Sequence, residues 1–233
     1  MPTDGGNLCK SRDVTFVTAT DQQRADIIEF LHKEFIRNEP MAASLNPSER
    51  EFDGVFADIV GICLKDSCTT LAYHDGKIIG LLLGAIKYHD KAEFPKRYSG
   101  IDFTEEITKG PYKNRNENRI ATFLDVAEAH QDELLGEDAK IFKIEIICVA
   151  VSARGLGIAK ELMRLSFEKA RSEGCDWMAA VATAVASQSL FAKLGFETFF
   201  EVPFVNFREN GQPVFRDVPD GGRSAKFIAI RLN

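Results

Sequence analysis

An apolar segment, a glycine-containing loop and an amphipathic segment follow one another directly between residues 141 and 174. Ile141 to Val151 is apolar and rich in β-branched residues except for Lys143 and Glu145, which predicts a strand at the centre of a sheet. The residues that follow the loop place apolar side chains at helical spacing, namely Leu162, Leu165, Phe167 and Ala170. The chain must therefore pass from a buried strand through a short loop into a helix, as α/β folds do.

The loop itself, Ser152 to Gly157, contains Gly155 and Gly157. A helix N-terminus has about four backbone N–H groups without intrahelical partners and attracts anions. Glycines allow an anion to approach closely and give the backbone the dihedral angles of an N–H nest. Glycines alone are equally compatible with a phosphate-binding loop and with a plain strand-to-helix turn.

Two widespread phosphate motifs do not fit this loop. A P-loop has four residues between its glycines and continues as Gly-Lys-Ser/Thr, whereas Gly155 and Gly157 are separated by Leu156 alone. A dinucleotide fingerprint needs a third glycine, where Lys160 stands, and an acidic residue at the end of the next strand, which here ends in apolar residues. Nucleoside-triphosphate and dinucleotide binding of these two kinds are excluded.

The N-terminal half alternates between predicted strands and helices. Val14–Ala19 is predicted as a strand, and Thr20 with Gln23 forms a capping box that opens a helix ending near Glu39. A second helix is predicted to start at Pro47-Ser48. Asp75-Gly76 between two apolar runs predicts a β-hairpin.

The second half continues the alternation. Residues 87–119 show no clear period and are predicted as a long loop with some helix. The remaining predicted elements are a helix over 121–135, strands over 177–182, 196–202 and 225–232, and a short helix over 184–194. With 233 residues, we expect a flexible tail over 1–12 and a single domain over 13–233.

Composition excludes several classes of function. The formal net charge is -6 and basic residues form no runs, so nucleic acid is not an expected partner. The five cysteines form no zinc-ligand pattern, and their odd number favours a reducing cytoplasm without a metal site. No apolar stretch is long enough for a signal peptide or a membrane span, so no membrane association is expected.

The loop does match another motif. Arg154-Gly155-Leu156-Gly157-Ile158-Ala159, between a long apolar strand and a helix, resembles the acyl-CoA-binding motif of the GNAT superfamily of N-acetyltransferases. The resemblance implies a mixed, mostly antiparallel twisted sheet of about seven strands flanked by helices. It also implies acetyl-CoA as co-substrate. Its pyrophosphate would be held by the backbone N–H groups of Arg154, Gly155, Leu156, Gly157, Ile158 and Ala159, and its pantetheine arm by the strand edge at Cys148, Val149 and Ala150.

A second segment, Phe191 to Phe196, resembles the aromatic-x-Lys-x-Gly-Phe ending of a later helix in the same superfamily. In many members the aromatic residue is a tyrosine that protonates the departing thiolate. Phe191 has no proton to donate, so another acid is required or none is needed. A thiol pKa of about 8.5 makes the thiolate a leaving group that can depart without a strong acid.

Four segments, Phe35–Met41, Leu194–Glu197, Val205–Phe207 and Gly211–Phe215, resemble segments of the arylalkylamine and dopamine acetyltransferases of invertebrates, so the likeness spans nearly the whole chain from Val14. Glu39-Pro40-Met41 resembles a segment whose glutamate is the general base in that subfamily. Thr183 and Ser187 stand where the subfamily has two hydroxyl residues one helical turn apart, and Ser189 is an alternative to Ser187. On the residues alone, a Glu-Pro pair is more often a helix terminator with a solvated carboxylate, and Ser187 is equally a cap or surface hydroxyl.

The resemblance implies direct transfer of acetyl from acetyl-CoA to the primary amine of a small arylalkylamine. The substrate amine has a pKa of about 10 and must lose a proton, which Glu39 would accept through water. An oxyanion would meet a backbone N–H near Val149. Alternatives are a protein or polyamine N-acetyltransferase of the same fold, a non-catalytic acyl-CoA-binding protein, and a ping-pong route through Cys148. His32, seven residues before Glu39, is expected to be a packed or surface residue.

Overall fold

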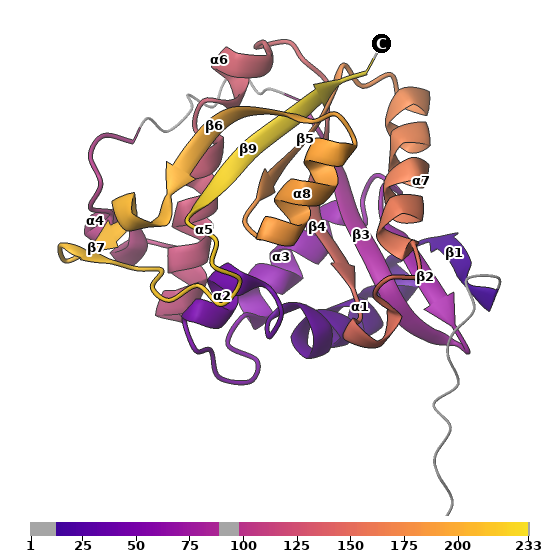
Figure 1. Ribbon diagram of the computed structural model, residues 1–233, viewed down its shortest axis with the longest axis horizontal. Coiled ribbons are helices and arrows are strands. Elements are labelled where there is room, and N and C mark those ends of the chain that lie inside the picture. Colours follow the sequence, from indigo (N-terminus) through magenta and orange to yellow (C-terminus); the bar gives the residue numbers. More distant parts are fainter. Residues whose placement is uncertain (1–12, 89–97, 233) are drawn as a thin grey trace, which may run out of the picture.

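The computed structural model describes residues 13–88 and 98–232, in which seven strands form one twisted sheet (Figure 1). The strand order is β1-β2-β3-β4-β5-β9-β6. The strands are β1 (Thr15–Thr18), β2 (Thr70–His74), β3 (Lys77–Lys87), β4 (Ile141–Val149), β5 (Trp177–Ala182), β9 (Ser224–Arg231) and β6 (Glu197–Pro203). Within the described ranges, β4 and β5 form the one parallel pair and all other neighbours are antiparallel. The predicted mixed, mostly antiparallel sheet is confirmed.

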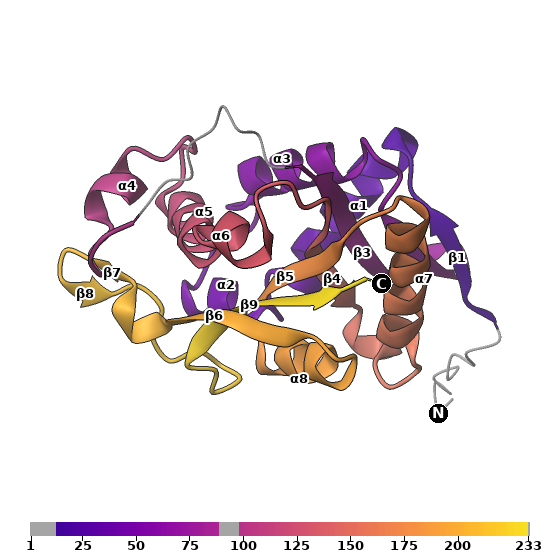
Figure 2. The ribbon, with the colours of Figure 1, turned by 90° about the horizontal axis from the view of Figure 1, so that it is seen from above.

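Helices cover both faces of the sheet (Figure 2). One face carries α1 (Arg24–Phe30), the π-helical turn η3 (Leu31–Phe35), α3 (Asp53–Cys63) and α5 (Arg115–Glu128), and the other carries α7 (Ile158–Ser172) and α8 (Val185–Lys193). Short helices are η2 (Asp21–Gln23), α2 (Pro40–Ser44), α4 (Thr104–Thr108), α6 (Gln131–Leu135), η4 (Val151–Ala153) and η5 (Phe204–Asn206). In the part of the chain that the structure describes, no helix combines the length and apolar character needed to cross a membrane.

The predicted elements of the N-terminal half are present, with two shifted boundaries. The first helical run ends at Phe35 and not near Glu39, and the short helix α2, which was not predicted, follows from Pro40. Thr20 and Gln23 form the predicted capping box. The second predicted helix begins at Asp53 and not at Pro47, because residues 49–52 form turns. The first turn of α3 is capped by the Glu117 carboxylate, which accepts a hydrogen bond from the Val55 N–H at 2.9 Å. A cap supplied from so far along the chain leaves no local signal in the sequence.

The segment 87–119 contains more helix than its pattern predicts. α5 begins at Arg115 and not at Ala121, and it ends at Glu128, with α6 as a separate helix. The first turn of α5 is polar, yet Glu117 and Asn118 are buried because they hydrogen-bond to the backbone of Val55 and Tyr112. Buried polar partners of this kind interrupt the apolar periodicity from which helices are predicted.

Turns and C-terminal strands follow the sequence closely. Asp75 and Gly76 both have positive φ, 48° and 70°, and join β2 to β3 in the predicted hairpin. The strand predicted over 177–182 has those bounds. A small hairpin of β7 (Arg208–Glu209) and β8 (Gln212–Pro213) was not predicted, although its Asn210-Gly211 turn is a hairpin signal. The predicted tail over 1–12 lies outside the described residues.

The parallel pair β4–β5 separates part-way along its length. Registered pairs run from Ile141 opposite Trp177 to Ile144 opposite Ala180, and pairing stops there. At this point the register between β3 and β4 shifts so that Glu145 is an extra residue, a bulge that bends β4 away from β5. The second half of β4 therefore presents an unpaired edge toward β5, which opens a gap in the middle of the sheet.

Candidate active site

The loop between β4 and α7 places two glycines in the left-handed region. Gly155 has φ 80° and Gly157, the N-cap of α7, has φ 79°. No side chain caps α7 in the described structure, and Cβ atoms added at both glycines would meet no atom within 4 Å. Ile158 is buried against Gly80 of β3, which fixes the helix start to the sheet. The result is an open helix N-terminus whose free N–H groups can bind an anion.

A cleft of about 500 Å³ occupies the gap between the splayed strands. Its walls come from β4, β5, α8 and the segment that ends η3, and Arg154 and Ala159 connect it to the glycine loop. The Ala150 N–H donates to the Ile79 carbonyl oxygen at 2.9 Å, toward β3. Because N–H groups of an extended strand alternate between its two edges, the Val149 N–H points to the opposite edge, into the cleft.

Glu39 is buried on the wall of this cleft, with 8% of its surface exposed. It is the N-cap of α2, and its carboxylate accepts hydrogen bonds from the N–H groups of Met41 at 3.2 Å and Ala42 at 2.6 Å. Pro40 at the first position of α2 favours this helix start. Burial raises the pKa of Glu39, against the lowering effect of the Ala42 hydrogen bond, so its carboxylate is a stronger base than an exposed one.

Thr183 contacts Glu39 directly. Its Oγ1 donates a hydrogen bond to Oε1 of Glu39 at 2.7 Å, across 144 residues of sequence. Thr183 follows the last residue of β5, where the strand has already separated from β4, and Ser187 lies in the first turn of α8. The Ser187 hydroxyl donates to the Ala184 carbonyl oxygen at 2.8 Å, so it is not the helix cap. Both hydroxyls line the cleft.

A smaller, mostly apolar cavity of about 70 Å³ adjoins the cleft. Glu39 and Thr183 line both spaces, and so do Phe35 and Glu145. Three aromatic rings, Phe35, Phe52 and Phe56, lie on its wall, with centroids 6.2 Å apart for Phe35 and Phe56. A basic carboxylate thus lies where an apolar cavity meets a cleft that leads to an anion-binding loop.

A family model described as "Acetyltransferase (GNAT) family" matches residues 28–196 of this chain. The matched residues include the glycine loop, Glu39 and Thr183. This chain belongs to the GNAT family. The match covers most of the sheet and both helices beside the cleft. The predicted family and fold are confirmed.

Solved structures show the same fold over nearly the whole chain. Arylalkylamine N-acetyltransferase 2 from Aedes aegypti is 26% identical with a TM-score of 0.80, covering 95% of this chain and 100% of its own. The Drosophila melanogaster polyamine N-acetyltransferase, which forms N-acetylagmatine, is 16% identical with a TM-score of 0.73, covering 94% and 100%. The NatC complex bound to a Gag peptide and CoA is 15% identical with a TM-score of 0.52, covering 95% and 99%. Proteins of this fold thus include an arylalkylamine N-acetyltransferase, a polyamine N-acetyltransferase and a complex that binds a peptide and CoA.

In this GNAT protein most of the predicted site residues lie together. Glu39, Thr183, Ser187, Cys148, Val149, Arg154 and Ala159 all line the cleft. Gly155, Leu156, Gly157 and Ile158 form the turn between Arg154 and Ala159. Ala150 and Arg154 differ from the prediction. The Ala150 N–H donates to Ile79 and its carbonyl oxygen accepts from the Ala153 N–H at 2.9 Å, and the Arg154 N–H donates to the Val151 carbonyl oxygen at 3.4 Å, so neither N–H is free for the cofactor. Ser189 is exposed outside the cleft lining, which favours Ser187 over it.

Three further acidic residues on the cleft wall, Glu34, Glu145 and Asp220, were not among the predicted site residues. Asp220 accepts hydrogen bonds from the N–H groups of Val185 at 2.7 Å and Gly222 at 2.9 Å, and its charge further raises the pKa of Glu39. It lies in an irregular loop, so no periodicity could have identified it. Glu145 is visible in the sequence only as a charge inside an apolar strand, which is a signal for a bulge or a site.

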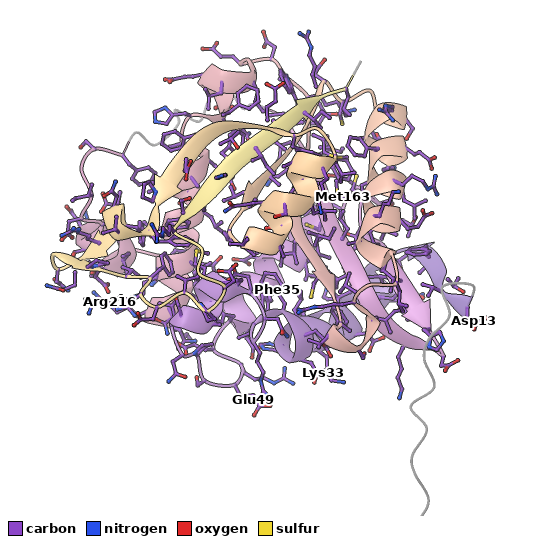
Figure 3. The ribbon with its side chains drawn as sticks, viewed as in Figure 1. Asp13, Lys33, Phe35, Glu49, Met163 and Arg216 are labelled. Carbon is purple, nitrogen blue, oxygen red and sulfur yellow. The ribbon has the colours of Figure 1, made fainter. Side chains whose placement is uncertain are left out.

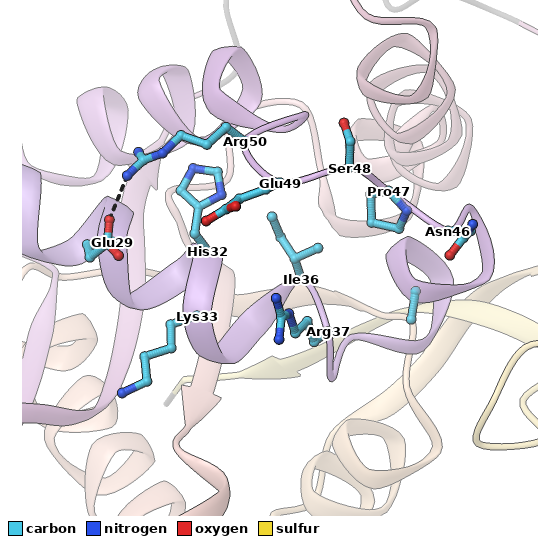
Figure 4. Close-up of a pocket in the computed structure, with 11 residues that line it drawn as sticks. Glu29, His32, Lys33, Ile36, Arg37, Asn46, Pro47, Ser48, Glu49 and Arg50 are labelled. Carbon is cyan, nitrogen blue, oxygen red and sulfur yellow. Dashed lines mark hydrogen bonds and ion pairs between the residues drawn. The ribbon is translucent and has the colours of Figure 1, made fainter.

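His32 lies on the other side of η3 in a separate cavity of about 450 Å³ (Figure 4). Its Nε2 lies 2.5 Å from Oδ1 of Asp53, and its ring contacts Phe56 edge to face at 5.2 Å. Arg50 and Glu29 form an ion pair at the same cavity, drawn as a dashed line in Figure 4. Glu39 does not line this space, which agrees with the packed role predicted for His32.

Proposed function

We propose that this chain is an acetyl-CoA-dependent N-acetyltransferase that acts on the primary amine of small arylalkylamines. One observation carries the proposal. The Glu39 carboxylate is buried at the junction between the cleft that leads to the glycine loop and the aromatic cavity. The arylalkylamine N-acetyltransferase 2 from Aedes aegypti, whose whole length aligns with this chain at 26% identity, supports the same substrate class.

Acetyl-CoA fits the cleft by the chemistry of its walls. The free N–H groups at the start of α7 would bind the pyrophosphate, with Arg154 adding positive charge beside them. The unpaired edge of β4 would pair with an amide of the pantetheine arm through the backbone of Val149, as one more strand pairs with a sheet edge. Cys148 pairs with Leu81 of β3, so it would contact the arm only through its side chain. The acetyl group would then lie near Glu39, and the Val149 N–H would stabilise negative charge that develops on its carbonyl oxygen.

Glu39 supplies the base for this reaction. An alkylamine with a pKa of about 10 arrives protonated and is a nucleophile only after losing a proton. The raised pKa of Glu39 makes proton transfer to its carboxylate, directly or through one water, more favourable. The same negative charge attracts the cationic amine into the site. Ser187 or Thr183 would relay a proton to the departing thiolate.

The aromatic cavity favours an apolar substituent on the amine. Among the described residues, two carboxylates line the cavity, Glu39 and Glu145. Glu39 would bind the reacting amine, and the charge of Glu145 is already neutralised by nearby lysines. Lys143 and Lys87 lie 3.3 and 3.5 Å from Glu145, and Lys143 also pairs with Glu128. No unbalanced carboxylate therefore remains in the cavity for the distal cation of a polyamine or agmatine, which distinguishes this proposal from the polyamine alternative.

Aromatic monoamines are expected to be the preferred substrates. Tryptamine, tyramine or dopamine should show kcat/KM at least about tenfold above spermidine, agmatine or a lysine peptide, because burying an aromatic ring contributes about 1.5–3 kcal/mol. Steady-state assays with acetyl-CoA and this panel measure the ratio. Equal or higher kcat/KM for a polyamine would overturn the assignment of the cavity, and a preference for the peptide would assign the chain to protein acetylation.

Direct transfer is expected without an acetyl-cysteine intermediate. Burial raises the pKa of the Cys148 thiol to about 12, with the charge of Glu34 adding to the effect, so Cys148 is a protonated thiol and a poor nucleophile at neutral pH. Intact-protein mass spectrometry after incubation with acetyl-CoA alone should show no added acetyl group. Stoichiometric acetylation that an amine then removes would establish the ping-pong route.

A further inference from the structure

A hydrogen bond joins the amine-acceptor side of the cleft to the side that leads into the glycine loop. Oε2 of Glu34 accepts from the Val151 N–H at 3.1 Å, across 117 residues of sequence. Val151 begins η4, the turn that leads into the glycine loop, and Glu34 lies in η3, next to Phe35 of the aromatic cavity. The acceptor side and the loop that binds anions are therefore tied by one carboxylate.

The segment that carries Glu34 also positions the base. η3 is a π-helical turn in which the Ile36 N–H donates to the Leu31 carbonyl oxygen at 3.1 Å, and the Glu39 N–H then donates to the Phe35 carbonyl oxygen at 2.7 Å. Such π-turns are rare and frequently lie at functional sites. A shift of Glu34 would move Phe35 and the backbone that holds Glu39 with it, because all three belong to one continuous run of hydrogen bonds.

The Glu34 carboxylate lies beside the expected path of CoA. Its carboxylate lines the cleft together with Cys148 and Arg154, and its charge and that of Arg154 act in opposite directions on the pKa of Cys148. A carboxylate here is electrostatically unfavourable for an anionic ligand. Val151 precedes the Arg154–Ala159 turn, so its N–H is bound by Glu34 without occupying the N–H groups expected to bind phosphate.

We infer that Glu34 is a positioning residue that transmits acyl-CoA binding to the acceptor cavity, an inference that rests on the proposed function for the identity of the ligand. When acyl-CoA orders the glycine loop, the Glu34–Val151 hydrogen bond holds η3, Phe35 and Glu39 in the arrangement that the amine requires. The hydrogen bond provides this coupling, and the charge of Glu34 only weakens acyl-CoA binding.

Two variants separate the hydrogen bond from the charge. Glu34→Gln keeps an acceptor oxygen for the Val151 N–H and removes the charge, whereas Glu34→Ala removes both. Lys33→Ala is the control, because Lys33 precedes Glu34 in η3 but lies on the outer surface, in contrast to Phe35 near the middle of the molecule (Figure 3). Hydrogen–deuterium exchange with and without saturating acetyl-CoA is read over residues 27–45 and 148–160, and calorimetry gives the acetyl-CoA affinity.

Acetyl-CoA should slow exchange in both segments of the wild type, of Lys33→Ala and of Glu34→Gln. In Glu34→Ala, protection of 148–160 should persist while that of 27–45 is lost, and the KM of the amine should rise about tenfold with a smaller change in kcat. Both Glu34 variants should bind acetyl-CoA more tightly than the wild type. Equal protection of 27–45 in Glu34→Ala and wild type would overturn the inference. Intact coupling in a protein that turns over no amine would overturn the proposed function alone.

Discussion

Gly157→Val is expected to remove measurable acetyl-CoA binding in calorimetry while leaving a folded protein. Gly157 is the N-cap of α7 with φ 79°, where a β-branched residue is strained and its side chain would enter the open space through which an anion approaches the helix start. Loss of two hydrogen bonds to a charged phosphate costs about 3–6 kcal/mol, which corresponds to a fall in affinity of about 10²- to 10⁴-fold.

Gly174→Val is the matched control for this variant. Gly174 follows the C-terminal end of the same helix, has φ 67° and, like Gly157, is exposed with no atom within 4 Å of an added Cβ. Both substitutions strain the backbone to a similar extent, so both should lower the melting temperature by a few degrees. The control should bind acetyl-CoA as the wild type does. Unchanged acetyl-CoA affinity in Gly157→Val would mean that the glycine loop is only a structural turn.

Local chemistry explains why much of the fold could be predicted from sequence. Thr20 with Gln23, and Asp75 with Gly76, specify a helix start and a hairpin through bonds within four residues, so their signal is complete in the sequence. Strand β4 was predictable because both of its faces are covered by helices, which requires an almost continuous apolar run. The glycine loop was predictable because its strand, loop and helix are consecutive in the sequence.

Features that depend on distant partners were missed or misplaced. The start of α3 is fixed by Glu117, and the polar first turn of α5 is buried because its partners lie elsewhere in the chain. The splay of β4 from β5 arises from a bulge at Glu145, which the sequence shows only as a charge inside an apolar run. Asp220 reaches the cleft from an irregular loop. Glu39 and Thr183 were each named from sequence, but their mutual hydrogen bond required the fold.

The surroundings of Glu39 act on the pKa of its carboxylate in opposite directions. As N-cap of α2 it should be ionised, because the Met41 and Ala42 N–H groups donate to it. Burial and the charge of Asp220 act in the other direction and raise its pKa above the ordinary 4.5. The net upward shift means that the helix cap also becomes a better proton acceptor. A residue that served only as a helix cap would gain nothing from this burial.

Glu39→Gln is therefore expected to lower kcat/KM for the amine by about 10²- to 10⁴-fold at neutral pH, with acetyl-CoA affinity unchanged. The amide oxygen can still accept from the Ala42 N–H, and the Thr183 hydroxyl can rotate to accept from the amide nitrogen. The free energy of unfolding should fall by about 1 kcal/mol, the usual effect of weakening an N-cap. Glu49→Gln, an exposed glutamate in the following loop, is the control that should change neither activity nor melting temperature.

The pH dependence of kcat/KM in the wild type and in Glu39→Gln tests most directly whether Glu39 is the base. A general base acts in its deprotonated form, so wild-type kcat/KM should rise as the pH passes upward through the raised pKa of Glu39, at a higher pH than for an ordinary carboxylate. Glu39→Gln should lack this limb. Its deficit should shrink toward pH 10, where more of the amine is already neutral and needs no base. Near wild-type activity with an unaltered profile would leave Glu39 as a helix cap, and loss of acetyl-CoA affinity would assign it to the shape of the cleft.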